Sequence, residues 1–98
     1  MVHIRYCRDI GKLWFDGHAE YAEKGQDIVC AAVSALYETL AMHESTYAGE
    51  LQPGHRFIWA APGKMETGIV IMDAFVAGFE QLAKQYPSHV SFDRMQEN

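Results

Sequence analysis

The chain has 98 residues, 49% of them hydrophobic, and 13 acidic against 8 basic residues give it a formal net charge of −5. This length predicts that residues 1–98 form one domain with a two-layer core. The acidic balance argues against a protein that holds nucleic acid by its phosphates, and no apolar run reaches the roughly 18 residues that would span a membrane.

The start of the chain and its cysteine content predict a cellular compartment. Met1 to Asp9 mixes polar and apolar side chains and lacks the hydrophobic segment of a signal peptide. We therefore expect a cytoplasmic protein, in which thiols stay reduced. Cys7 and Cys30 are then free thiols, and the question is whether either of them is reactive.

The first elements in chain order are two predicted strands and a loop. Val2–Arg8 alternates apolar and polar residues, which is the period of a strand. Asp9–Lys12 resembles a hairpin turn because Gly11 tolerates positive φ, and Leu13–Gly17 follows as the second strand. Ala19–Gly25 is polar and bounded by glycines, which predicts a mobile loop.

A helix is predicted next, from about Ile28 to His43. Asp27 precedes it and is expected to be its N-cap, because its carboxylate can accept hydrogen bonds from the free amides of the first turn. Apolar residues at helical spacing form its expected buried stripe: Val29, Val33, Leu36 and Leu40.

The second half of the chain predicts two strands, a helix and a last strand. Thr46–Leu51 and Arg56–Ala60 are expected to be strands, joined by a turn at Gln52-Pro53-Gly54. A helix is expected from about Met65 to Tyr86, where Pro87 stops it, and Ser88–Arg94 alternates as a strand. The order ββαββαβ predicts an α+β two-layer sandwich, with a mixed or antiparallel sheet and two helices.

Cys30 and His18 are the candidates for catalysis. Cys30 lies three positions after the expected N-cap, where free amides and the helix dipole favour an anion, lower the pKa of a thiol and can stabilise an oxyanion. A cysteine nucleophile usually needs a base within hydrogen-bond reach. His18 lies at the end of the second expected strand, and the loop that follows can return the chain so that the two side chains meet.

Structural interpretations of the same residues stay open at this point. A cysteine in an Ala-Val-rich helix is usually a core residue, and a histidine at a strand end is usually surface. Asp27 is either a cap or a residue that orients His18, as the third member of a triad does. Ser34, one helical turn after Cys30, either donates to the thiolate or substrate or is a small residue that allows close packing.

Metal and cofactor sites have little support in the sequence. Cys7 lies on an expected strand with nothing near it that lowers the pKa of its thiol, so we interpret it as structural. Cys7, His18 and Cys30 lack the paired ligand spacing of a metal site. We therefore expect no metal and no other cofactor.

The run Gly17-His18-Ala19-Glu20-Tyr21-Ala22, followed by Gly25-Gln26-Asp27-Ile28-Val29-Cys30-Ala31-Ala32-Val33-Ser34-Ala35-Leu36, resembles the ribosomal-processing cysteine protease (Prp) family. The family pattern is Gly-His-Ala, a short variable loop, and then Gly-x-Asp-Ile-Val-Cys-Ala-Ala-x-Ser. The later segment Phe75-Val76-Ala77-Gly78-Phe79, with Tyr86-Pro87, is similar to the family's second helix and its end. From about Tyr47 to Thr67 the chain matches the family poorly.

The resemblance implies a cysteine endopeptidase that removes the short N-terminal extension of a large-subunit ribosomal protein. It implies His18 and Cys30 as the catalytic pair, Asp27 and Ser34 in supporting roles, and a homodimer. It also implies a lid over the cleft at about Ala19–Gly25. The residues implied in the lid or in substrate binding are Gly17, Ala19, Glu20, Tyr21 and Gly25.

Two other hypotheses remain beside the protease. A non-catalytic module of the same fold would bind a peptide or a ribosome-assembly factor without turnover. A thiol switch would form a disulfide between Cys7 and Cys30 under mild oxidant.

Overall fold

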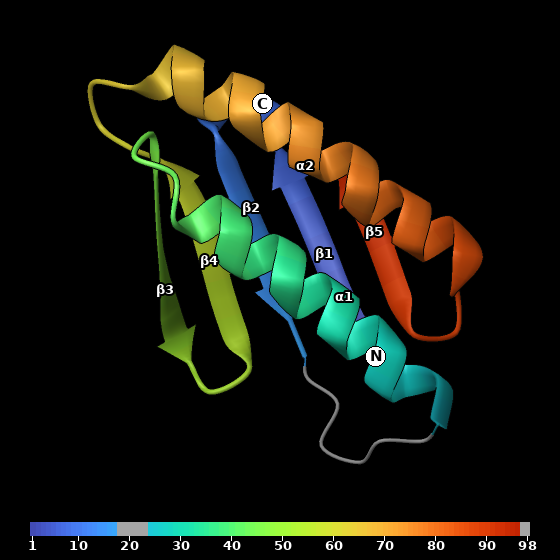
Figure 1. The fold of residues 1–98 in the computed structure, drawn as a ribbon. Helices are drawn as coiled ribbons and strands as arrows, with labels where there is room; N and C mark the ends of the chain where they lie inside the picture. Colours follow the sequence, from blue (N-terminus) through green and yellow to red (C-terminus); the bar gives the residue numbers. More distant parts are fainter. Residues whose placement is uncertain (18–23, 97–98) are drawn as a thin grey trace.

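The computed structural model describes the backbone of residues 1–17 and 24–96 and the side chains of residues 1–17 and 28–96. The expected order ββαββαβ is confirmed (Figure 1). The elements are β1 (Val2–Cys7), the 3-10 helix η1 (Arg8–Ile10), β2 (Lys12–Asp16), α1 (Lys24–Ala41), β3 (Thr46–Gln52), β4 (His55–Ala60), α2 (Met65–Gln85) and β5 (Val90–Arg94).

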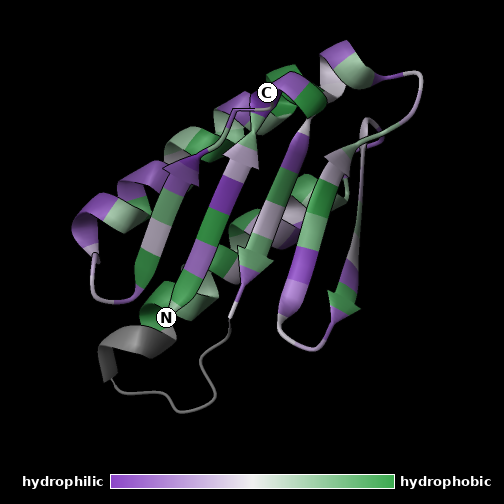
Figure 2. Cartoon of the chain, turned by 180° about the vertical axis from the view of Figure 1, so that it is seen from behind, coloured by the Kyte–Doolittle hydropathy of each residue, from purple (hydrophilic) through white to green (hydrophobic). Residues whose placement is uncertain are grey.

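The strands form one mixed sheet in the order β3-β4-β2-β1-β5. Neighbouring strands are antiparallel except β1 and β5, which run parallel because the α2 crossover returns the chain to the same end of the sheet. Both helices cover one face of this sheet, and the view from behind shows the strands with the helices beyond them (Figure 2). The α+β two-layer sandwich predicted from the sequence is therefore correct.

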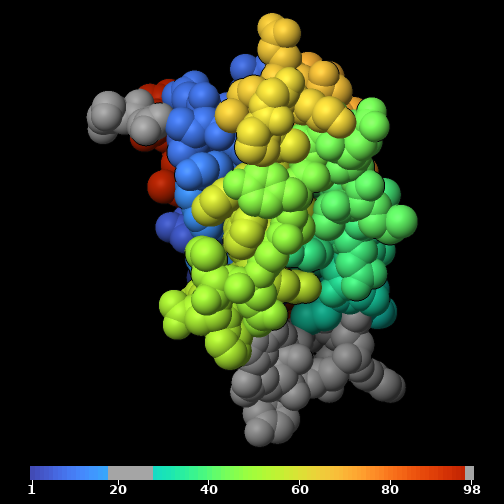
Figure 3. All heavy atoms as spheres, turned by 90° about the vertical axis from the view of Figure 1, so that its left-hand side faces the viewer, coloured from blue at the N-terminus to red at the C-terminus, as the bar shows by residue number. Residues whose placement is uncertain are grey.

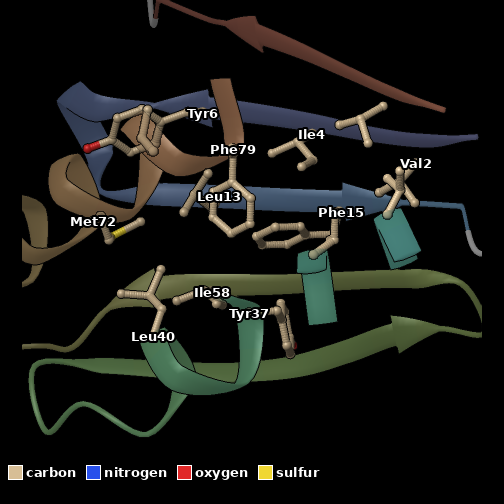
Figure 4. Packing of buried hydrophobic residues seen from close by; sticks show 14 of the residues in the cluster. Val2, Ile4, Tyr6, Leu13, Phe15, Tyr37, Leu40, Ile58, Met72 and Phe79 are labelled. Atoms are coloured by element: carbon tan, nitrogen blue, oxygen red, sulfur yellow. The ribbon is translucent and has the colours of Figure 1, made fainter. Parts of the chain in front are cut away.

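The core lies between the sheet and the helices because apolar residues alternate along each central strand. Figure 4 shows the central side chains of this core, in which the Phe15 ring meets the rings of Tyr37 and Phe79 edge-on at 5.0 and 5.2 Å between centroids. The fully buried members are Tyr6, Phe15, Phe79, Ile4, Leu13, Leu40, Ile58, Met72, Val29, Val33, Val76 and Val90.

The beginning of the first helix differs from the expectation. The structure places the first residue of α1 at Lys24, so Lys24 and Gly25 belong to the helix and not to the predicted loop. Two facts explain the difference: a glycine costs a helix only about 1 kcal/mol, and an acidic residue in the first turn interacts favourably with the helix dipole. The interpretation of Asp27 as the N-cap is therefore wrong, because its backbone is already helical.

Candidate active site

The site is built where the chain leaves β2, at the same end of the sheet as the first turn of α1 and the β3–β4 turn (Figure 1). Gly17 follows β2 with φ of 98°, a left-handed conformation that side chains with a Cβ rarely adopt. Its amide donates to the Gly54 carbonyl at 2.8 Å, and a Cβ built on it would lie 2.3 Å from the Met1 carbonyl oxygen. The backbone at Gly17 thus restrains the direction in which the chain leaves the sheet.

Several predicted site residues lie outside the part of the chain that the structure describes. They are His18, Ala19, Glu20 and Tyr21, and the geometry of the proposed Cys30–His18 pair is therefore not tested. Gly25 and Asp27 lie in the first turn of α1, and the Asp27 side chain is also outside the described residues.

Cys30 is in α1, and its side chain is half-buried. Because the helix begins at Lys24, Cys30 lies in its second turn. The prediction that Cys30 lies among the free amides of the first turn is therefore wrong. The dipole effect falls off within that first turn, and an amide at this depth normally donates to the carbonyl four residues earlier. The backbone amide of Cys30 is therefore not one of the free first-turn amides that were expected to stabilise an oxyanion.

One flank of α1 carries Cys30, Ser34 and Tyr37 beside the buried stripe. At 100° per residue, these positions lie to the same side of Val29 and Val33. The Tyr37 hydroxyl lies 3.4 Å from the Gly49 carbonyl and 3.2 Å from the Phe57 carbonyl, so this flank faces β3 and β4. Figure 3 shows the β3–β4 hairpin packed beside α1. Cys30 and Ser34 therefore face the hairpin side of the molecule.

A cavity of about 390 Å³ lies at the β3–β4 turn, lined by Glu50, Pro53, Gly54 and Arg56. The Arg56 guanidinium lies over the Tyr37 ring, 4.6 Å from its centroid. Burial raises the pKa of Tyr37 and the positive charge of Arg56 partly opposes the rise, so the phenol stays a neutral hydrogen-bond donor at physiological pH. Arg56 therefore lines this hollow and also contacts Tyr37, which lies on the same flank of α1 as Cys30.

Sequence reasoning missed Arg56 and Glu50 as candidate site residues. Arg56 alternates in phase with Ile58 and Ala60, whose side chains enter the core. A charged residue at a core-facing position of a strand is unusual, and this pattern could have marked Arg56 as a candidate site residue.

The other thiol is remote from this site. Cys7 is 3% exposed and alternates out of phase with the core residues Ile4 and Tyr6, so it points to the face of the sheet without helices. It ends β1 at the opposite end of the sheet from the start of α1 (Figure 1). Both cysteines are free, and the position of Cys7 on the far face of the sheet from α1 argues against a disulfide switch with Cys30.

A second cavity, of about 520 Å³, lies at that remote end between η1 and the start of α2. Arg8, Glu66, Thr67, Ile69 and Val70 line it, and the lining includes no thiol or imidazole. Within residues 1–17 and 28–96, no group of three His, Cys, Asp or Glu side chains is arranged to hold a metal ion. No helix in the described part of the chain is long and apolar enough to cross a membrane.

Solved structures share this fold. The crystal structures of the essential ribosomal processing protease Prp from Staphylococcus aureus, with a substrate peptide and with a covalently linked product peptide, match with TM-scores of 0.78 and 0.76. Their sequences are 19% and 18% identical, and the matches cover 97% of this chain and 100% of theirs. A Streptococcus mutans protein matches with a TM-score of 0.72 at 24% identity, over 98% of this chain and 93% of that one.

Sequence comparison identifies the family. The ribosomal processing cysteine protease Prp of Mycoplasma pneumoniae is 34% identical to this chain, and the match covers 84% of this chain and 85% of that protein. The family model described as Cysteine protease Prp matches residues 1–91, including the stretch from Tyr47 to Thr67 where the sequence pattern was weak. The chain therefore belongs to the Prp family of cysteine proteases.

Proposed function

We propose that this protease removes the short N-terminal extension of a large-subunit ribosomal protein, with Cys30 as the nucleophile and His18 as the general base. The observation that carries the proposal is the position of Cys30, half-buried on the α1 flank that faces β3 and β4. The ordered run from Gly17 to Leu36 supports it, as does a relative that is itself named for ribosomal processing.

The proposed reaction begins with proton transfer from the Cys30 thiol to His18. The thiolate attacks the scissile carbonyl, His18 then protonates the leaving amine, and water releases the acyl-enzyme. We assign a hydrogen-bond donor role to the Ser34 hydroxyl, which lies one turn after Cys30 on the same flank. We keep for Asp27 the proposed role of orienting His18.

The proposed peptide path runs between the Cys30 flank and the β3–β4 hairpin. Arg56 and Glu50 are added to this path because they line the hollow at the β3–β4 turn, and Arg56 contacts the Tyr37 ring on the flank of Cys30. Gly17, Ala19, Glu20, Tyr21 and Gly25 remain the proposed lid and peptide contacts. The resemblance to the family also implies small and basic residues after the cut, and the acidic side chain of Glu20 would suit them.

The proposal extends to the setting of the enzyme. We place the protease in the cytoplasm, where its cysteines stay reduced, and assign it to ribosome biogenesis without nucleic-acid contact. We treat residues 1–98 as a single domain and the active species as a homodimer.

Incubation with the extended and the mature ribosomal protein, followed by mass spectrometry, tests the proposed function. Wild type is expected to shorten only the extended form, and Cys30→Ala and His18→Ala should each slow cleavage at least about 1,000-fold. Cys7→Ala is the matched control and should cleave like wild type. Full cleavage by Cys30→Ala would refute the assignment, and peptide binding without turnover by wild type would favour the non-catalytic module.

A further inference from the structure

Asp16 ends β2 two residues before His18, and its carboxylate joins three strands. The Arg5 guanidinium of β1 donates through Nη2 to Oδ2 at 2.9 Å. The Nδ1 atom of His55, the first residue of β4, lies 2.8 Å from Oδ1. Both oxygens of the carboxylate are therefore engaged at the end of the strand that leads to the proposed base.

Backbone contacts restrain the same point of the chain. The Cα atoms of Asp16 and His55 are partners in the antiparallel ladder of β2 and β4. The next amide, of Gly17, donates to the Gly54 carbonyl at 2.8 Å. Side-chain and main-chain bonds thus tie the last residues of β2 to the β3–β4 turn.

These side-chain bonds exceed what pairing of the strand requires. The ladders to β1 and β4 already pair every residue of β2, Asp16 included. The side chains of Arg5, Asp16 and His55 are 42%, 26% and 47% exposed, and ion pairs with this much exposure contribute little to stability. What they do restrict is the position and direction in which the chain leaves the sheet.

We propose that Asp16 and His55 are positioning residues of the protease, which fix the end of β2 and thereby the place of His18 relative to Cys30. This inference rests on the proposed function, because it assigns the base to His18. The pair lies on the sheet face opposite the helices and acts through the main chain. Arg5 completes the cluster by holding the second carboxylate oxygen.

Two measurements on the full chain test the proposal: cleavage of the extended ribosomal protein, and the pH profile of Cys30 alkylation by iodoacetamide, read by peptide mapping. His55→Ala and Asp16→Asn should lower kcat about tenfold and change KM less than about twofold. Both variants should shift the pH dependence of Cys30 alkylation toward the pH dependence measured for His18→Ala. His55→Asn, whose amide nitrogen can replace Nδ1, should recover a large part of the activity.

His3→Ala is the matched control. His3 lies on the same face at the same end of the sheet and is the β1 partner of Asp16 in the ladder, but its Nδ1 lies 2.7 Å from the Ser91 hydroxyl. It should leave kcat and the alkylation profile unchanged. Equal losses of kcat in His3→Ala and His55→Ala would overturn the inference. A loss of kcat in His55→Ala that is fully explained by a smaller fraction of folded protein would overturn it as well.

His18→Ala separates this inference from the proposed function. If His18→Ala leaves both cleavage and Cys30 alkylation as in wild type, His18 is not the base and both proposals fail. If His18→Ala changes both measurements and His55→Ala changes neither, the proposed function stands and the positioning role is refuted.

Discussion

Two aspartates at opposite ends of the sheet each accept hydrogen bonds from two side chains, yet they hold different kinds of partner. Asp73 of α2 accepts from the Tyr6 hydroxyl at 2.7 Å and from Arg8 Nε at 2.9 Å, and Tyr6 is 1% exposed. Asp16 of β2 holds Arg5 and His55, whose side chains are 42% and 47% exposed. One cluster joins a helix to the core, and the other joins strand ends near the solvent.

This difference separates the stability of the fold from the placement of its chemistry. A buried phenol that loses its acceptor keeps the full cost of its desolvation, whereas an exposed ion pair exchanges protein partners for water. Removal of the Asp73 carboxylate should therefore cost the sandwich more stability than removal of the Asp16 carboxylate. The Asp16 end should determine where the chain leaves the sheet.

The largest effect is expected from Gly17→Ala at the Asp16 end. The alanine would have to adopt φ of 98° with its Cβ 2.3 Å from the Met1 carbonyl oxygen. Strain and overlap together should lower the free energy of unfolding by about 2–4 kcal/mol, measured by urea titration. Cleavage should fall as well, since the residue next to the proposed base must move.

Gly63→Ala is the control for that substitution. Gly63 also has a positive φ, 79°, but no heavy atom lies within 4 Å of a Cβ built there. It should cost only the backbone strain, about 1 kcal/mol. Equal losses at Gly17 and Gly63 would show that the close approach of Met1 is relieved by a small shift and does not constrain the strand end.

The next effect is at the Asp73 end. Asp73→Ala leaves the buried Tyr6 hydroxyl without its acceptor and should lower the free energy of unfolding by about 1–3 kcal/mol, measured by urea titration. The rate of Cys30 alkylation should not change, because the substitution lies at the remote end. In the Tyr6→Phe background the same substitution should cost clearly less, and an unchanged cost would contradict the assignment to the phenol.

Alkaline pH provides a third test of the same cluster. Burial raises the pKa of Tyr6 well above its ordinary value of 10.0, and the hydrogen bond to Asp73 raises it further. The folded state therefore keeps the proton while the unfolded chain releases it. This contribution to stability is complete below pH 10 and is lost as the pH rises above it, by up to about 1.4 kcal/mol per pH unit.

The measurement is the urea midpoint at pH 8, 9.5 and 10.5 for wild type and Tyr6→Phe. The stability advantage of wild type should shrink as the pH rises. Burial also raises the pKa of Tyr37, so Tyr37→Phe should remove a separate part of the alkaline loss. A constant difference between wild type and Tyr6→Phe would show that Tyr6 does not cause the loss.

The fold could be predicted from the sequence because its signals are local. Strand alternation and helical spacing gave the element order and the buried stripes, and the Cys30 motif indicated the family. The predicted start of α1 is wrong because Gly25 resembles a loop boundary, although the first turn of a helix tolerates a glycine. That error carried over to Asp27 and to the environment of the Cys30 amide.

The polar clusters could not be predicted because they depend on strand register and helix placement. Asp16 and His55 are 39 residues apart, and Tyr6 and Asp73 are 67 apart. A shift of β4 by one residue would turn His55 to the other face of the sheet. The sequence around Asp16 or His55 alone does not determine how β2 and β4 are aligned. The contact between His18 and Cys30 stays a prediction.

The smallest change in stability should accompany a clear loss of activity. Asp16→Asn keeps the shape of the side chain and removes its charge, so unfolding in urea should change by less than about 1 kcal/mol. Its cleavage rate should still fall about tenfold, because a displaced base slows proton transfer without unfolding the sheet. Asp73→Ala should show the reverse, with lower stability and normal chemistry in the folded fraction. If Asp16→Asn instead destabilises the protein as strongly as Asp73→Ala, the carboxylate at the end of β2 is structural, and the division between the two ends of the sheet is wrong.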